Sequence, residues 1–383
     1  MTAYLDNSAT TAPCEEAVSA VQKALTEGWY NPSALYRPAL EVQKAMENVR
    51  QICLEATGAR GQKIIFTSGG TEADNIALLG YLKTIRKPGR VLLSSVEHPA
   101  VLECAEAIRK LGHTVEEIPV DREGIIDIGK FISLLDNDVI QIGIMQVNNE
   151  TGAVQPIDAI SKARDQYCPA ASIHVDGVQG FLKTPFDFNH SGVQTYAFSG
   201  HKIHAVKGTG GLVISSKHRI LPIVFGGGQE TGLRSGTENT AGIMALGAAV
   251  KKFTGDNTND MRRLKNLLYN EIKDAIPGAE INGPDPMSVT SAPHIINISL
   301  KPVRSQTMLF ALEGDGIYVS AGSACSSRKQ KISPVLKAMG LSADSADCAL
   351  RFSLCPYTTE QEIRYTAAKV AEHWNELKQY TRR

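Results

Sequence analysis

KIIFTSGGTEADNIALL, residues 63–79, is the stretch that decides the fold class of this chain. Its β-branched and aromatic beginning predicts a strand at Lys63–Thr67. The glycine pair that follows predicts a tight turn, and a helix is expected from about Thr71 to Ile85. A strand that passes through a glycine turn into a helix is typical of a βα unit. The free N–H groups at the start of such a helix form a potential anion site.

The same alternation continues on the C-terminal side. Further strands are predicted at Arg90–Ser95, Thr114–Pro119, Val139–Val147, Ser172–Asp176, Thr195–Ser199 and Gly211–Ser215, with helices at Pro99–Leu111 and Ile157–Tyr167. This order predicts an α/β large domain at residues 13–255, with a mostly parallel sheet flanked by helices.

The pattern changes at Thr254–Asp260, a polar, turn-rich segment that predicts a domain boundary. A smaller α+β C-terminal domain is expected at residues 256–383, and residues 1–12 are expected to pack with it. Its predicted elements are helices at 261–275 and 306–313, strands at 294–300, 317–320 and 349–353, and a last helix from Thr359 with Glu362 as capping-box partner.

Composition excludes several classes of protein. The 383 residues carry 40 basic and 40 acidic side chains, which argues against a nucleic-acid-binding surface. No apolar run approaches the ~20 residues of a membrane helix, and the first residues lack the features of a signal peptide. Seven cysteines without a C-x₂₋₄-C pair argue against disulfides and a metal site. A cytoplasmic protein is therefore expected.

Two residues at predicted strand ends carry the first functional hypothesis. Lys202, in Ser-Gly-His-Lys, follows a strand and stands where an amine can form a Schiff base, although a lone loop lysine is usually just solvated. Asp176 closes another strand, at the edge where α/β sheets bind ligands. An acid there suits the pyridinium nitrogen of pyridoxal phosphate (PLP), and a helix-capping role is its plainer interpretation.

Three further segments have a possible chemical role. His98 follows a strand and could stack on a planar cofactor or move protons, or it could be an ordinary half-buried histidine. Arg351 lies in the apolar strand ALRFSL and needs an anion, either a substrate carboxylate or a structural salt-bridge partner. Cys325 lies among small residues in SAGSACSS, within an expected mobile loop at 320–331, so a reactive thiol is favoured there over a buried one.

Taken in order, these segments resemble the cysteine desulfurases of the NifS/IscS type, which are class V aminotransferase-like, fold-type I PLP enzymes. The resemblance runs nearly from end to end. It rests on YLDNSATT (4–11), NPS (31–33), FTSGGTEADN (66–75), EH (97–98), VNNETG (147–152), HVDGVQ (174–179), FSGHK (198–202), GGGQE and RSGTEN (226–239), SAGSACSS (320–327) and RFSL (351–354).

The resemblance implies the catalytic roles. Lys202 would bind PLP as a Schiff base, and His98 would stack on its ring and move protons. Asp176 would pair with the pyridine nitrogen and Gln179 with the ring hydroxyl. Cys325 would take the sulfur atom of the substrate.

The resemblance also implies the remaining contacts. Asn149 and Arg351 would bind the substrate carboxylate. The cofactor phosphate would be bound by Gly70, Thr71, Ser199, His201 and, from the other subunit of a homodimer, Thr237. The chain departs from the usual pattern at Ala205-Val206, where Gly-Pro is common, and at Gly69-Gly70, where Gly-Ala is common.

The implied activity converts L-cysteine to L-alanine and leaves the sulfur as a persulfide on Cys325. The sulfur would pass to a protein acceptor, either an iron–sulfur scaffold or a tRNA-thiolation enzyme, without direct contact with nucleic acid or membrane. A selenocysteine lyase or a cysteine sulfinate desulfinase on the same fold is the alternative. A non-catalytic sulfur carrier is a third possibility, and it requires a protein that takes up no PLP.

Overall fold

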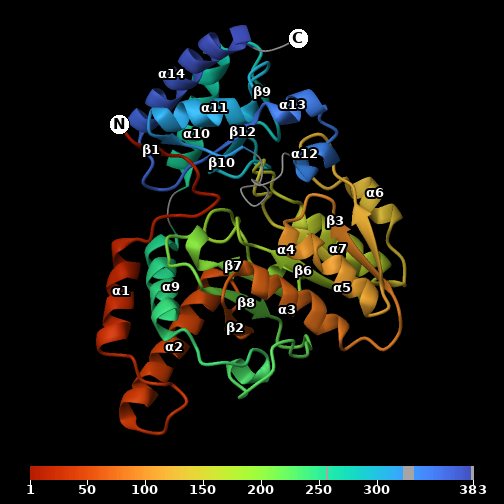
Figure 1. Cartoon of the computed structure of the whole chain (residues 1–383). Coiled ribbons are helices and arrows are strands. Elements are labelled where there is room, and N and C mark those ends of the chain that lie inside the picture. Colours follow the sequence, from red (N-terminus) through yellow and green to blue (C-terminus); the bar gives the residue numbers. More distant parts are fainter. Residues whose placement is uncertain (256–257, 322–331, 381–383) are drawn as a thin grey trace.

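A computed structural model describes residues 1–255, 258–321 and 332–380, so the predicted nucleophile Cys325 lies outside the described residues. The described chain contains a seven-stranded sheet in the order β2-β8-β7-β6-β5-β3-β4 (Figure 1). Its strands are β2 Lys63–Thr67, β3 Arg90–Ser94, β4 Thr114–Ile118, β5 Val139–Met145, β6 Ser172–Asp176, β7 Thr195–Ser199 and β8 Gly210–Ile214.

The prediction of a mostly parallel sheet is confirmed. Strand β8 runs antiparallel to both of its neighbours, β7 and β2, and every other pairing in the sheet is parallel. The connection from β7 to β8 is too short for a helical crossover, which explains the change of direction. The carboxyl ends of β5, β6 and β7 therefore meet at one edge of the sheet, where a ligand site is expected.

Helices cover both faces of this sheet (Figure 1). They are α1 Glu15–Thr26, α2 Arg37–Ala56, α3 Gly70–Leu82, α4 Pro99–Leu102, α5 Cys104–Lys110, α6 Ile128–Ser133, α7 Ile157–Tyr167, α8 Phe188–Ser191 and α9 Thr240–Phe253. Two predictions of helix bounds were wrong. The helix expected to reach Ile85 ends at Leu82, and the one expected at Pro99–Leu111 is divided at Glu103, which caps both α4 and α5.

The C-terminal part forms a second body with an antiparallel sheet in the order β12-β10-β9. Its elements are α10 Asn259–Ala275, β9 Glu280–Ile281, β10 Ile295–Ser299, α11 Ser305–Gly314, β11 Ile317–Tyr318, α12 Pro334–Ala338, α13 Ala343–Asp347, β12 Ala349–Ser353 and α14 Glu360–Leu377. The capping box predicted for α14 is confirmed, since the side chains of Thr359 and Glu362 bond each other's backbone N–H groups.

The N-terminal residues lie on this second body. β1, Ala3–Tyr4, pairs in parallel with β11, and Ala3 and Leu5 belong to the same apolar cluster as the buried side chains of α10, β10, β12 and α14. Helix α12 contacts the other body, because Val335 and Leu336 pack in the apolar cluster of the large sheet. The boundary at residue 255 stays a prediction. Within the described ranges, no helix is long and apolar enough to cross a membrane.

Candidate active site

A cavity of about 260 Å³ lies at the carboxyl edge of the large sheet, against the second body. Its volume is near the lower end of small-ligand pockets, which run from ~300 to ~1,000 Å³. Ten of the predicted site residues line it: Gly70, Thr71, His98, Asn149, Asp176, Gln179, Ser199, His201, Lys202 and Arg351. Thr237 is exposed and does not line this cavity.

Lys202 ends a short 3-10 helix, Gly200–Lys202, directly after β7. Its Nζ donates hydrogen bonds to the backbone oxygens of Ser8, at 2.5 Å, and Ala9, at 2.8 Å. The oxygen of Ser8 also accepts a hydrogen bond from Gln179 Nε2, at 2.9 Å. The N-terminal segment therefore positions both the lysine amine and the glutamine that face the cavity.

Asp176 closes β6, is buried and lines the cavity. Its Oδ1 accepts a hydrogen bond from the N–H of Val178, at 2.9 Å. Burial, with the nearby carboxyl of Asp74, raises the pKa of Asp176 to about 7. Without a cationic ligand, this carboxyl is therefore costly to ionise, and a protonated ring nitrogen is the kind of group that would make it ionise readily.

Two more buried carboxyls lie near Asp176. Asp74, on α3, lies 3.1 Å from Nε2 of His174, whose Nδ1 lies 3.0 Å from Thr195 Oγ1. Burial raises the pKa of Asp74 and lowers that of His174 to about 4, so the pair is favoured in its neutral form. Glu97 Oε1 accepts a hydrogen bond from the N–H of Met145, at 2.7 Å, and burial raises the pKa of this carboxyl well above its usual value.

His98 is half-buried and caps α4, where its Nδ1 accepts a hydrogen bond from the N–H of Ala100, at 3.1 Å. With Nδ1 as acceptor, the proton of the neutral ring lies on Nε2. Burial lowers the pKa of this ring, and the charge of Lys202 lowers it further. The ring is therefore neutral near pH 7, and its Nε2 is the atom that can exchange a proton.

The predicted anion site lies at the N-terminus of α3. Gly70 is buried here, and a Cβ at this position would overlap with Cγ2 of Val178. Ser199 and His201 reach the cavity from the end of β7, and Nδ1 of His201 lies 3.2 Å from Thr10 Oγ1. Burial and the neighbouring lysines lower the pKa of His201 to about 4, so its ring is neutral near pH 7.

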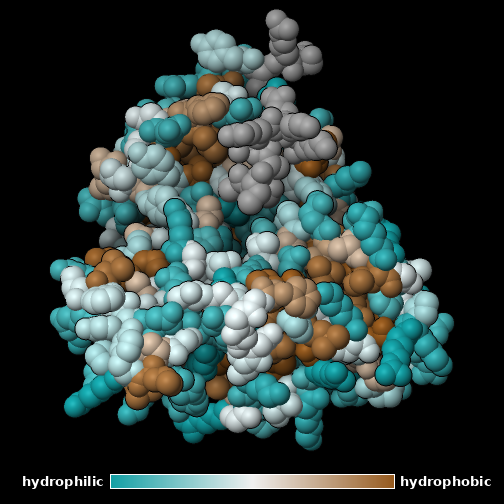
Figure 2. Space-filling model, turned by 60° about the horizontal axis from the view of Figure 1, so that its bottom comes forward, coloured by the Kyte–Doolittle hydropathy of each residue, from teal (hydrophilic) through white to brown (hydrophobic). Residues whose placement is uncertain are grey.

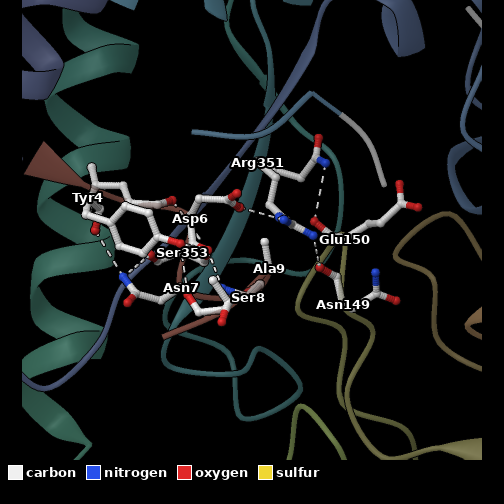
Figure 3. A network of polar contacts seen from close by, with 12 residues as sticks. Tyr4, Asp6, Asn7, Ser8, Ala9, Asn149, Glu150, Arg351 and Ser353 are labelled. Atoms are coloured by element: carbon white, nitrogen blue, oxygen red, sulfur yellow. Dashed lines mark hydrogen bonds and ion pairs between the residues drawn. The ribbon is translucent and has the colours of Figure 1, made fainter. Parts of the chain in front are cut away.

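Arg351 lines the same cavity from the middle of β12, and Figure 3 shows its polar contacts. Its Nη1 donates to the backbone oxygen of Asn149, at 2.9 Å, and its Nη2 to Asp6 Oδ1, at 2.7 Å. Nε is buried and bonds no described side chain or backbone group. Arg351 therefore has the salt-bridge partner of one interpretation, whereas its binding of a substrate carboxylate stays a prediction.

Several lining or supporting residues had no predicted role. Ser8 and Ala9 lie in the motif YLDNSATT and Asp74 in FTSGGTEADN, so both motifs were noticed without a function for these positions. Asp6 lies in YLDNSATT and His174 in HVDGVQ, again without a predicted function. Their contacts join residues about 100 to 345 positions apart, a separation that no local pattern reveals.

The site unites an amine, a buried carboxyl, a neutral histidine, the N-terminus of a helix and a buried guanidinium. Such a set can hold a planar, phosphorylated aldehyde and an amino acid with its carboxylate on the arginine. Among the described ranges, no group of histidine, cysteine and acidic side chains could hold a metal ion.

Comparison with known proteins gives consistent matches over nearly the whole chain. Residues 3–365 match the aminotransferase class-V family. The cysteine desulfurase IscS of Dictyoglomus turgidum is 36% identical over 367 residues, covering 95% of this chain and 92% of that protein. The solved structure of a NifS-like protein is 31% identical with a TM-score of 0.91, covering 98% of this chain and 100% of the other. SspA in complex with cysteine is 28% identical with a TM-score of 0.82, covering 94% and 100%.

Proposed function

The chain belongs to the aminotransferase class-V family, and on this basis we propose that it is a PLP-dependent cysteine desulfurase. It converts L-cysteine to L-alanine and transfers the sulfur atom to the thiol of Cys325, which becomes a persulfide. The observation that carries this proposal is the meeting of Lys202, Asp176, His98 and Arg351 around one cavity, each from a different segment of the chain.

The residues of the site fit PLP. A carboxyl whose pKa burial raises to about 7 is suited to a ring nitrogen that carries a proton, and Asp176 is that carboxyl. Gly70 lines the cavity at the start of α3, and a Cβ there would overlap with the side chain of Val178. Lys202 would hold the aldehyde carbon, Gln179 the ring hydroxyl, and Thr71, Ser199 and His201 the phosphate.

When bound, PLP withdraws electrons from the substrate and so lowers the barrier to loss of the Cα proton. His98 and Lys202 are the groups of this chain that can hold that proton, since one presents a neutral ring and the other an amine. Arg351 and the side chain of Asn149 orient the substrate by its carboxylate. The thiolate of Cys325 attacks the substrate sulfur, and the Cβ–S bond breaks as the S–S bond forms. The electron pair of the broken bond stays with the substrate carbon, which takes up a proton on the way to alanine.

The proposal extends to a homodimer. Exposed apolar side chains occur near the end of α1, in the segment before α2 and in the loop before Thr237, and the most exposed of them are Leu25, Trp29, Leu35 and Phe225. Figure 2 also shows hydrophobic side chains in patches on the forward face. Such patches are typical of protein interfaces. A second copy would cover them and would bring its own Thr237 towards the phosphate site.

The sulfur acceptor and the location are further parts of the proposal. An iron–sulfur scaffold or a tRNA-thiolation enzyme in the cytoplasm would receive the sulfur from Cys325. Mixing the ³⁵S-persulfidated protein with each purified acceptor and following the label on non-reducing gels tests this part. A label that stays on Cys325 with both acceptors would contradict it.

The activity is tested by measuring L-alanine and sulfide together from L-cysteine in the presence of a thiol reductant. Cys325→Ala should abolish sulfide release and leave the visible absorbance of bound PLP unchanged. Cys355→Ala is the matched control, because Cys355 is the one cysteine of the described ranges that is not buried. Full desulfurase activity in Cys325→Ala would refute the proposed nucleophile.

A lyase that acts on selenocysteine or cysteine sulfinate is the alternative on the same fold. Those substrates release their leaving group with less need of a thiol nucleophile. Activity towards them that survives in Cys325→Ala, with no activity on L-cysteine in the wild type, would favour this alternative. A protein that takes up no PLP would instead indicate a sulfur carrier.

A further inference from the structure

Asp6 and Arg351 form an ion pair at the wall of the active-site cavity (Figure 3). Asp6 Oδ1 lies 2.7 Å from Nη2 of Arg351. The two partners differ in exposure, because the side chain of Arg351 is 2% exposed and that of Asp6 is 19% exposed. Asp6 can therefore return to water when the pair separates, whereas the guanidinium cannot.

The position of Arg351 is fixed by its strand. β12 is hydrogen-bonded to β10, where Arg351 is opposite Asn297, and its N–H also donates to the oxygen of Ser320, at 2.8 Å. Asp6 lies at the edge of the same sheet, where it forms an isolated parallel β-bridge with Ser353. In an exchange of partners, the carboxylate of Asp6 is thus the group that moves.

A buried guanidinium needs an anion at all times, since leaving it unpaired is costly. In the described chain, Asp6 is the carboxylate within ion-pair distance of Arg351. Glu150 also faces Arg351, but its Oε2 accepts a hydrogen bond from the hydroxyl of Ser333, at 2.6 Å, and burial raises its pKa. His294 lies in the same region and is held neutral by burial.

A substrate carboxylate would approach the same guanidinium from the cavity that Arg351 lines. Two carboxylates on one guanidinium repel each other, because like charges a few ångströms apart disfavour the ionised state of both. The arriving carboxylate must therefore displace Asp6 or share the guanidinium with it at a cost in affinity.

We infer that Asp6 is a resident counterion that stabilises Arg351 in the empty site and competes there with the α-carboxylate of the ligand. The identity of that ligand rests on the proposed function. The product L-alanine carries the same carboxylate as the substrate. A counterion that returns to Arg351 weakens the hold on the product and favours its release.

The test compares PLP-loaded, full-length Asp6→Asn, Asp6→Glu and wild type. Asp347→Asn is the matched control, because it removes an exposed Arg–Asp pair with Arg304 that is remote from the cavity. L-Alanine and L-alaninamide, which lacks the carboxylate, are titrated against the visible absorbance of the bound cofactor. The melting temperature of each protein is measured with and without these ligands.

Asp6→Asn should melt below the wild type without ligand and bind L-alanine about ten-fold more tightly, with no gain for L-alaninamide. Asp6→Glu keeps the charge and should keep the affinity of the wild type, and Asp347→Asn should change neither affinity. Weaker binding of L-alanine by Asp6→Asn, or an equal change for both ligands, would overturn the inference.

A second measurement serves if Asp6→Asn does not fold. Asp6→Ala, loaded with PLP and purified in formate, should gain melting temperature as formate is added, because formate replaces the missing counterion. The wild type should show no such gain, and its absence in Asp6→Ala would overturn the inference. A wild type that neither binds L-alanine nor consumes L-cysteine would refute the proposed function instead, and the formate series would still test Asp6.

Discussion

Asp176→Asn should stabilise the cofactor-free protein and weaken its hold on PLP. The carboxyl of Asp176 is buried and accepts one hydrogen bond, from the N–H of Val178. An amide of the same shape keeps an oxygen for that hydrogen bond and removes a charge that the buried site disfavours. The change therefore removes the cost of ionising a buried carboxyl in the cofactor-free protein. It also removes the proposed partner of the ring nitrogen of PLP.

The magnitude follows from the pKa of this carboxyl. Burial raises the pKa of Asp176 from 3.8 to about 7 in the folded protein, a difference that corresponds to about 4 kcal/mol. Well below pH 3.8, the carboxyl is protonated in both states, so wild type and variant should approach equal stability as the pH falls towards that value. Between pH 4 and 7 the unfolded chain ionises first, so the wild type loses stability relative to the variant. Above pH 7 the carboxyl is ionised in both states, and the difference in stability between wild type and variant reaches its full size.

The assay is urea denaturation of the cofactor-free proteins between pH 4 and pH 9, followed by circular dichroism. Asp158→Asn is the control, because Asp158 is exposed on α7. The same three proteins are then titrated with PLP, and Asp176→Asn should bind it least tightly. Equal stability of wild type and Asp176→Asn across the whole pH range would refute the argument that burial dominates this carboxyl.

Three further predictions rest on packing and charge. Gly70→Ala should weaken PLP binding at least ten-fold in an absorbance titration, because its Cβ would overlap with Val178, and unchanged affinity would contradict the crowding argument. Thr359→Ala should lower the free energy of unfolding by about 1 kcal/mol in urea, since it removes the cap of α14, and an unchanged midpoint would contradict this. Arg50→Leu should cost about 3–5 kcal/mol in the same assay by leaving Glu230 buried without its bidentate partner, whereas Arg37→Leu, at an exposed pair, should cost under about 1 kcal/mol.

Strand bounds in the large sheet could be predicted closely because glycine and polar turns interrupt short β-branched runs. Ser172–Asp176 and Thr195–Ser199 were predicted to the residue. Helices α1 and α2 were not predicted, although the signal was present in α2, where Val42, Met46, Val49 and Cys53 recur every three or four positions and are all buried. The division at Glu103 was hidden because both halves continue one apolar pattern.

The candidate site was predictable to the extent that its residues end strands or begin helices. Asp176, Lys202 and Gly70 follow that rule, and the parallel order of β6 and β7 brings the first two together. Contacts that depend on packing between distant segments could not be predicted from the sequence. The pair of Asp74 and His174 joins α3 to β6, and neither residue has a local neighbour that predicts the other.

The N-terminal segment is the clearest example of such packing. It contacts two site residues, Lys202 and Arg351, and its motif predicted neither contact. Its carbonyls at Ser8 and Ala9 hold the amine of Lys202, while Asp6, two residues earlier, pairs with Arg351. Ser8 also donates its N–H to Ser353 Oγ, which joins the segment to β12. One short segment of the chain therefore supplies both the counterion of Arg351 and the acceptors of the lysine amine, so a substitution that displaces this segment should affect both ends of the site.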